Sequence, residues 1–268
     1  MFDAGEGAQI AFQKAKIGWN KKTSIFVTHL HGDHCVGILG LLQTMSLQNR
    51  TENVDIFGPP GIDEFIAANL KILNFGLTFP IRIIRIKEGL VFEGKRYTIH
   101  VCEAQHSIQA YSYLFTEKDK PGQFFPDKAK KLGVPEGKHW HQLQNGSMVK
   151  IGKKVIKPSD VMGKKRRGKK IGISGDTRPT KKLEKFFEGC DYLTFDSTYS
   201  DTLKYKAKEN FHSTAKEAAE LARKARVTNL ILTHFSARYE NEQELVKEAK
   251  TVHDSVIAAK DLLEIEIK

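Results

Sequence analysis

The sequence predicts an α/β protein. Short apolar runs typical of strands alternate along the chain with segments whose apolar residues recur at helical spacing. The run 24–28 is apolar on both faces, as expected of a central or parallel strand. Titratable residues directly follow several of the predicted strands, and α/β folds place their functional sites at such strand ends. With 268 residues, 40% of them hydrophobic, the chain can bury a substantial core.

The N-terminal half alternates helices with strands and then turns to strands alone. The breaker Gly58-Pro59-Pro60-Gly61 closes a strand, and the apolar residues that follow it recur at helical spacing. The strands from 81 to 116 are expected to form an antiparallel region. The expected helices are 8–15, 37–45 and 62–75. The expected strands are 24–28, 54–57, 81–86, 97–103 and 111–116.

The C-terminal half returns to alternating strands and helices. Thr214 and Glu217 have the spacing of a capping box, which predicts a helix that begins there. The expected strands are 171–174, 192–195, 229–233 and 262–267. The other expected helices are 183–188 and a last one that carries Leu245, Ala249, Val252 and Val256.

Between these halves, the stretch 118–157 lacks strong periodicity, as functional or disordered segments often do. Its Trp140 either stacks on bases or riboses of a nucleic acid or anchors a solvated loop. A dense positive run follows. It is either a solvated face or, because it leads into a strand that ends near Asp176, a phosphate-binding surface. The run contains Lys164, Lys165, Arg166, Arg167, Lys169 and Lys170.

Charge and cysteine content narrow the class of protein. A net charge of +11, from 43 Lys+Arg against 32 Asp+Glu, favours an anionic partner such as nucleic acid or reflects a basic bias of the whole proteome. Three widely spaced cysteines do not suggest a disulfide framework and fit a reducing compartment. The sequence shows neither a membrane span nor a signal-peptide pattern, so we expect a cytoplasmic protein.

A cluster of metal-ligating residue types follows the apolar run 24–28. His29, His31, Asp33 and His34 lie within six residues, where a strand that ends in a tight loop would direct them into one pocket. Imidazole and carboxylate groups suit a borderline ion such as zinc, although manganese or iron can occupy similar sites. Further groups stand at other strand ends, namely His106, Asp176, Asp196 and His234.

Taken together, these residues supply enough ligands for two metal ions that share a carboxylate. Two-metal sites clamp the attacking and leaving oxygens of a phosphoryl transfer and activate a bound water. A basic protein with such a site is suited to act on RNA or DNA.

The order of these residues resembles the ligand order of the metallo-β-lactamase superfamily. Four neighbouring segments narrow the resemblance to the ribonuclease Z family, whose members process the 3′ ends of tRNA. These segments are Phe2-Asp3-Ala4-Gly5-Glu6-Gly7, Gly172-Ile173-Ser174-Gly175-Asp176-Thr177-Arg178-Pro179, Phe211-His212-Ser213-Thr214 and Thr233-His234-Phe235-Ser236-Ala237-Arg238-Tyr239. The resemblance covers essentially the whole chain. It implies a four-layer αββα sandwich in a single domain over residues 1–268.

The resemblance also implies the roles of individual residues and two zinc ions per subunit. The first zinc would be held by His29, His31 and His106. The second would be held by Asp33, His34 and His234, with Asp176 bridging both ions. Asp33 would also accept the proton of the attacking water, and His212 would act as general acid. Asp196, where many relatives have Glu, would orient His212, and Asp3 would buttress the ligand loop.

The implied activity is a zinc-dependent endoribonuclease that removes the 3′ trailer of precursor tRNA. It would leave a 3′-hydroxyl on the tRNA and a 5′-phosphate on the trailer. The stretch 118–157 would be an inserted flexible arm that binds tRNA, and the protein a homodimer. The residues expected to contact RNA are Lys164, Lys165, Arg166, Arg167 and Trp140.

The family's first strands are expected upstream of Phe2, so a form extended upstream should be more stable and more active than the 268-residue form. Two alternative functions stay open. One is another hydrolase of the same fold that acts on a phosphodiester or thioester. The other is an RNA-binding protein whose catalysis is impaired by the missing N-terminal strands.

Overall fold

A small parallel sheet begins the fold in the computed structural model, which describes residues 1–267. Its strands are β1 (Thr23–Phe26), β2 (Val54–Gly58) and β3 (Ile81–Arg85), in that order. Phe2 forms a parallel bridge with Phe26, so the first residues of the chain lie beside β1. The antiparallel expectation for β3 is wrong. Arg82 of β3 pairs in register with Asp55 of β2 and makes a 2.8 Å ion pair with its carboxylate.

A larger sheet has the order β12-β11-β10-β9-β6-β5-β4. The strands β9 to β12 are parallel to one another, so their carboxyl ends share one edge of the sheet. The antiparallel part contains β4 (Gly89–Glu93), which the sequence analysis did not predict, and β5 (Tyr97–Ala104) and β6 (Ala110–Glu117). The parallel part consists of β9 (Lys170–Ile173), β10 (Tyr192–Asp196), β11 (Asn229–Thr233) and β12 (Val256–Ala258).

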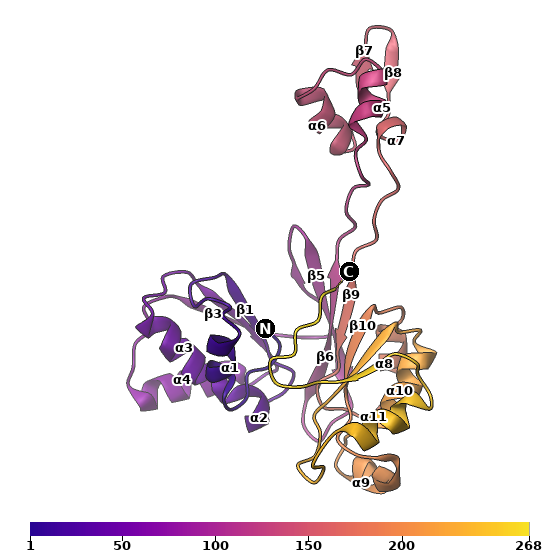
Figure 1. Cartoon of the computed structure of the whole chain (residues 1–268). Helices are drawn as coiled ribbons and strands as arrows, with labels where there is room; N and C mark the ends of the chain where they lie inside the picture. The colour runs from indigo at the N-terminus through magenta and orange to yellow at the C-terminus, as the bar shows by residue number, and fades with distance from the viewer. Residues whose placement is uncertain (268) are drawn as a thin grey trace. The chain divides into compact units, whose positions relative to one another are not determined.

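The two sheets pack face to face, and helices cover their outer faces (Figure 1). Aromatic rings fill the space between the sheets. Phe26 and Phe57 of the small sheet contact Phe92 and Tyr113 of the large one. The Tyr113 hydroxyl also donates a 2.6 Å hydrogen bond to the Val27 carbonyl. The four layers are therefore helix, sheet, sheet and helix.

The helices fall into two groups according to the sheet they follow. The small sheet has α1 (Ala8–Lys14), α2 (Gly32–Cys35), α3 (Gly37–Leu47) and α4 (Ile62–Leu73). The large sheet has α8 (Lys181–Phe186), the 3-10 helix η1 (Asp201–Leu203), α9 (Lys204–Glu209), α10 (Ala215–Lys224) and α11 (Gln243–Lys250). None of the helices within residues 1–267 combines the length and apolar composition needed to cross a lipid bilayer.

The C-terminal expectations need two corrections. The last helix ends at Lys250, so Val252 and Val256 both lie outside it, and Val256 lies in β12. The strand expected at 262–267 does not form. Leu262 and Leu263 are exposed, which shows that this apolar run has no sheet face to pack against.

The chain divides into a larger unit, residues 1–94, 98–115 and from 170 onward, and a smaller unit, residues 95–97 and 116–169. The aperiodic stretch 118–157 is therefore structured in its own right. It contains short elements around a small apolar core that includes Ala129, Leu143 and Val161. The elements of the smaller unit are α5 (Pro126–Lys131), α6 (Lys138–Gln144), β7 (Val149–Ile151), β8 (Lys154–Ile156) and α7 (Pro158–Val161).

Trp140 takes part in this small core. Its indole Nε1 donates a 3.0 Å hydrogen bond to the Val134 carbonyl, and its ring lies 5.1 Å from that of Phe124. These contacts favour the anchoring interpretation of Trp140. The four consecutive cations are exposed side chains of the same unit: Lys164, Lys165, Arg166 and Arg167. RNA contact by any of these five residues stays a prediction.

Candidate metal centre

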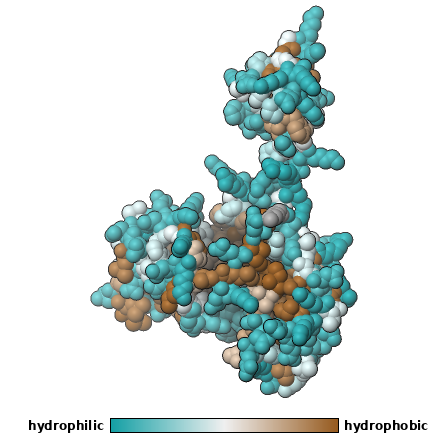
Figure 2. All heavy atoms as spheres, in the orientation of Figure 1, coloured by the Kyte–Doolittle hydropathy of each residue, from teal (hydrophilic) through white to brown (hydrophobic). Residues whose placement is uncertain are grey.

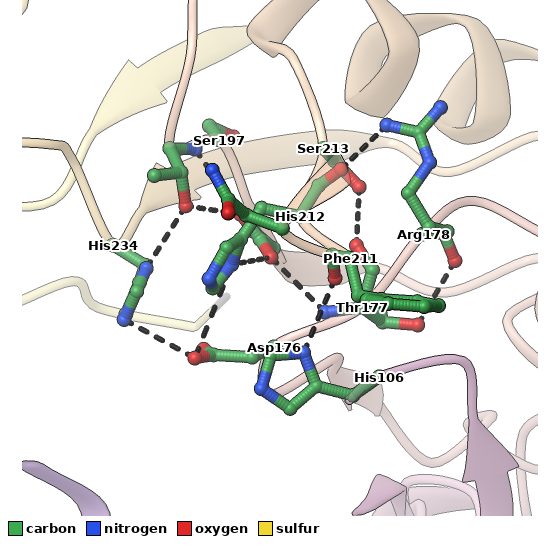
Figure 3. A network of polar contacts seen from close by, with 12 residues as sticks. His106, Asp176, Thr177, Arg178, Ser197, Phe211, His212, Ser213 and His234 are labelled. Atoms are coloured by element: carbon green, nitrogen blue, oxygen red, sulfur yellow. Dashed lines mark hydrogen bonds and ion pairs between the residues drawn. The ribbon is translucent and has the colours of Figure 1, made fainter. Parts of the chain in front are cut away.

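The candidate metal-binding and catalytic residues all belong to the larger unit, and most of them stand at or just after strand ends. Six of them come from three stretches of the chain. His29 and His31 follow β1, Asp33 and His34 lie in α2, and Asp196 ends β10, from which His212 lies a short way along the chain. The remaining three residues each follow a strand: His106 follows β5, Asp176 follows β9 and His234 follows β11. Figure 3 shows His106, Asp176, His212 and His234 directed toward a common space.

Two groups of four side chains have donor atoms within 4.8 Å of one another. The first group is His29, His31, His106 and Asp176. The second group is Asp33, His34, Asp176 and His234. Asp176 belongs to both groups, so its carboxylate lies where it could join two ions. His212 belongs to neither group of four. It forms a third group with Asp196 and His234.

Asp3 holds two of these histidines from the outer side. Its Oδ2 accepts a 2.8 Å hydrogen bond from His34 Nδ1 and another of 2.8 Å from the Thr28 hydroxyl. Because that hydroxyl donates to Asp3, its oxygen can accept the 2.9 Å bond from His29 Nδ1. Both imidazoles therefore carry a hydrogen on Nδ1 and direct their Nε2 into the site.

Asp196 repeats this arrangement on the other sheet. Its Oδ2 accepts a 2.8 Å hydrogen bond from His212 Nδ1, so the shorter carboxylate does reach this histidine. Its Oδ1 accepts a 2.7 Å bond from the Thr198 hydroxyl, whose oxygen lies 2.9 Å from His234 Nδ1. His234 consequently turns its Nε2 toward Asp176 Oδ2 at 3.2 Å and Asp33 Oδ2 at 3.4 Å.

The histidines of the first group of four also direct unprotonated nitrogens toward one another. His106 Nδ1 donates to the Phe211 carbonyl at 3.2 Å, which leaves its Nε2 bare. His31 Nδ1 lies 3.0 Å from His29 Nε2 and 3.2 Å from His106 Nε2. At least two of these three nitrogens carry no hydrogen, so hydrogen bonds alone do not satisfy the cluster. A cation between them would.

His34 supplies a further test of whether the site fits a metal. Its Nε2 is a buried polar atom that makes no well-formed hydrogen bond, and its nearest carboxylate oxygens are those of Asp176 at 3.3 Å and Asp33 at 3.5 Å. Buried polar groups in native proteins nearly always have a partner. Nitrogen and carboxylate donors with outer hydrogen bonds are the ligands that zinc prefers. The residues present therefore fit a pair of such ions.

Burial and neighbouring charges set the ionisation of these groups. Burial, together with the charge of His34, lowers the pKa of His29 to about 3, and burial also lowers the pKa of His106. Burial disfavours the charge on Asp176, but contact with His34 outweighs it and holds the Asp176 pKa well below its usual range. Neutral imidazoles and an ionised carboxylate are the metal-binding forms.

His34 behaves differently from His29. Burial lowers its pKa, but contacts with the carboxylates of Asp176 and Asp3 outweigh this effect and raise the pKa to about 10. A metal ion that takes the Nε2 of His34 would release that proton.

Three residues at the site have an uncommon backbone conformation. Asp3, Phe211 and His234 have positive φ angles of 52°, 59° and 60°, which side chains other than glycine rarely adopt. The N-terminal segment also lies very close to the ligand loop, because a Cβ at Gly5 would collide with the Asp33 carbonyl. The loop geometry is therefore held by the surrounding structure and not by local preference.

Several supporting groups have no distinctive sequence signal. The hydroxyls of Thr28 and Thr198 and the carbonyl of Phe211 orient histidines, yet threonines and carbonyls occur everywhere in a sequence. The only available signal is adjacency, because Thr28 precedes His29 and Thr198 follows Asp196 by two residues.

Comparisons with known proteins show what this chain is similar to. Residues 1–131 match the family model described as the β-lactamase superfamily domain. The chain is 65% identical over its full length to the ribonuclease Z of Nitrosopumilus maritimus, of which it covers 90%. It is 35% identical to the ribonuclease Z of Bacillus subtilis, again over its full length and 88% of the relative. The crystal structure of the short form of human tRNase Z superposes with a TM-score of 0.69 at 27% identity, with 100% of this chain and 87% of that chain covered.

We expect the Asp3→Asn substitution to weaken metal binding by about 10-fold to 100-fold, because outer hydrogen-bond partners tune metal ligands by this amount. The amide can no longer accept from both His34 and Thr28 with a full negative charge. Competition with a chromophoric chelator measures the affinity. Asp63→Asn is the matched control, since Asp63 pairs with Arg85 on the surface. Equal affinities of the two variants would contradict the role of Asp3.

Proposed function

This chain belongs to the ribonuclease Z family of endoribonucleases, which has the metallo-β-lactamase fold, and we propose that its substrate is precursor tRNA. It would cut after the discriminator base, leaving a 3′-hydroxyl on the tRNA and a 5′-phosphate on the 3′ trailer. The observation that carries the proposal is the convergence of seven metal-ligating side chains, two groups of four that share Asp176, in a chain related over its full length to ribonucleases Z.

The metal ions in this proposal are two Zn²⁺ per subunit. His29, His31 and His106 would hold the first, Asp33, His34 and His234 the second, and Asp176 would bridge them. Such a pair of ions lowers the pKa of a bound water toward ~7 and stabilises the attacking and leaving oxygens of an in-line displacement. Support comes from the histidine nitrogens that face inward and from the hydrogen bonds on their outer sides.

Asp33 would accept the proton of the attacking water. Its side chain is 57% exposed, the largest exposure among the ion-paired ligands, so it lies on the open side from which substrate arrives. Burial disfavours its charge, but His34 and His234 outweigh this and lower its pKa, so the carboxylate is in the ionised form, which is the form that can accept a proton.

His212 would act as the general acid. Burial lowers its pKa, but the hydrogen bond to Asp196 outweighs burial and raises it, which favours the imidazolium form. Because Nδ1–H is held by Asp196, the second proton sits on Nε2. As water oxygen bonds to phosphorus and the bond from phosphorus to the 3′-oxygen breaks, Nε2 gives that proton to the departing oxygen.

Binding of the tRNA would depend on positive charge. The smaller unit presents Lys164, Lys165, Arg166 and Arg167 on its surface, and the whole chain carries a net charge of +11. Contacts from such residues go mainly to phosphates, so affinity should fall as salt rises. Trp140 is a weaker candidate for base stacking, because its ring already packs against Phe124.

A homodimer is the proposed assembly. Large apolar side chains are exposed on neighbouring helices of the small sheet, including Leu47 on α3 and Ile72 on α4 at 74% and 78% exposure. Figure 2 shows apolar atoms gathered over α3 and α4. Patches of this kind commonly mark protein interfaces.

The cytoplasm is the proposed location. The three cysteines are all free thiols, as a reducing compartment would keep them.

We expect the zinc-loaded protein to cut a precursor tRNA with a 3′ trailer at one position, and to stop cutting after treatment with a strong chelator. Added zinc should restore the activity. Sequencing of both product ends identifies the cut, and elemental analysis counts the ions per chain. A folded, metal-loaded sample that leaves the precursor intact would refute the proposed function.

Asp33→Ala should reduce the single-turnover cleavage rate by about 10²-fold to 10⁴-fold, because it removes both a metal ligand and the proton acceptor. His212→Ala should reduce the rate comparably while leaving the metal content unchanged. Gel-based rates and elemental analysis on the same samples separate the two effects. An Asp33→Ala rate within tenfold of the unsubstituted protein would contradict its assigned role.

The double substitution Leu47→Asp/Ile72→Asp should convert a dimer to a monomer, because buried charges without partners oppose association. Sedimentation equilibrium measures the mass in solution. Leu90→Asp, at an exposed position of β4, serves as the control and should stay dimeric. A monomeric unsubstituted chain would refute the assembly itself.

A further inference from the structure

Arg178 makes several buried polar contacts beside the site, and neither metal binding nor the proposed proton transfers use its side chain. Its guanidinium donates to the His212 carbonyl at 2.5 Å and to both carboxylate oxygens of Glu217, at 2.8 Å and 2.5 Å. The two side chains of this ion pair are only 14% and 7% exposed. A planar guanidinium is the group that can bond a carboxylate and a carbonyl in one fixed geometry.

The main chain of Arg178 is fixed to the metal ligands. Arg178 follows Asp176 by two residues, and its amide donates to the Gln105 carbonyl at 2.9 Å. The Gln105 amide in turn donates to the Thr177 hydroxyl at 3.0 Å, and Gln105 directly precedes His106. The Asp176 segment and the His106 segment are thus held together at the residue from which the guanidinium extends.

The side chain of Arg178 reaches the segment that carries the proposed acid. Glu217 accepts from the Thr214 amide at 3.1 Å, and the Thr214 hydroxyl accepts from the Glu217 amide at 3.1 Å, which caps α10. The Ser213 hydroxyl donates to the Thr177 carbonyl at 2.5 Å. Figure 3 shows Arg178 and Thr177 beside Phe211, His212 and Ser213.

The segment 211–214 also has a strained start. Phe211 has a φ of 59°, and its carbonyl holds His106 Nδ1. Without an outside restraint, this segment would be free to relax to a more common backbone conformation, which would move the His212 ring and the Phe211 carbonyl together.

We propose that Arg178 is a positioning residue that fixes the His212 imidazole relative to the metal ligands. It acts through the His212 carbonyl and Glu217 and touches neither substrate nor metal. This inference rests on the proposed function, because it concerns the acid of that reaction. Its consequence is specific. Loss of the guanidinium should impair protonation of the departing oxygen and leave metal binding intact.

A precursor tRNA with sulfur in place of the 3′-oxygen at the cut site tests this directly. A thiolate departs without protonation, so its cleavage does not need the acid. Arg178→Met/Glu217→Gln removes both buried charges together and avoids leaving Glu217 unpaired. Under single-turnover conditions, we expect this variant to cut the ordinary substrate at least tenfold more slowly and the sulfur substrate at nearly the unsubstituted rate. His212→Ala should show the same pattern.

Three controls complete the design. Elemental analysis should find the full metal content in the double variant, and the substrate concentration for half-maximal rate should not change. Arg178→Lys keeps a positive charge that can pair with Glu217 but cannot bond Glu217 and the His212 carbonyl in the planar geometry of a guanidinium. This variant should fold normally and still cut the ordinary substrate slowly. Equal losses on both substrates, loss of metal, or full activity of Arg178→Lys would each overturn the inference. Failure of the unsubstituted protein on both substrates would instead refute the proposed function.

Discussion

The candidate metal centre depends on hydrogen bonds to the outer nitrogens of its histidines. Asp3 and Asp196 each hold one imidazole directly and a second through a threonine hydroxyl, Thr28 or Thr198. An ionised carboxylate only accepts hydrogen bonds, so the direction of each bond along the relay is fixed from the carboxylate outward. His29, His34 and His234 consequently direct their Nε2 atoms to the interior.

These relays tie the site to both sheets. Asp3 reaches the ligand loop because Phe2 pairs with Phe26 at the end of β1, and Asp196 is itself the last residue of β10. The sheets are held face to face by aromatic rings and by the Tyr113 hydroxyl. A change in sheet packing would therefore alter the distance between Asp33 or His34 on one side and His234 on the other, because these residues are carried by different sheets.

The candidate acid His212 and the segment that carries Asp176 are held by the same carboxylate. Asp196 Oδ2 accepts from both His212 Nδ1 and the Thr177 amide, which directly follows Asp176. Removal of one partner leaves the others buried and unsatisfied, at a cost of roughly 1–3 kcal/mol for each group. Side chains in such a network are coupled, so the effects of single substitutions there should not add.

Sequence alone determined the fold class and the family, because the spacing of ligands after strand-like runs is a local pattern. The metallo-β-lactamase fold is confirmed, and the ligand residues, whose roles stay proposals, do lie close together in space. Sequence did not determine the parallel pairing of β3, which places Arg82 against Asp55 of the neighbouring strand. Nor did it determine the fold of 118–157, whose core forms from short pieces without periodicity. Tertiary structure alone decided which nitrogen of each histidine faces inward, since the partners of His34 and of His106 lie 31 and 105 residues away in the chain.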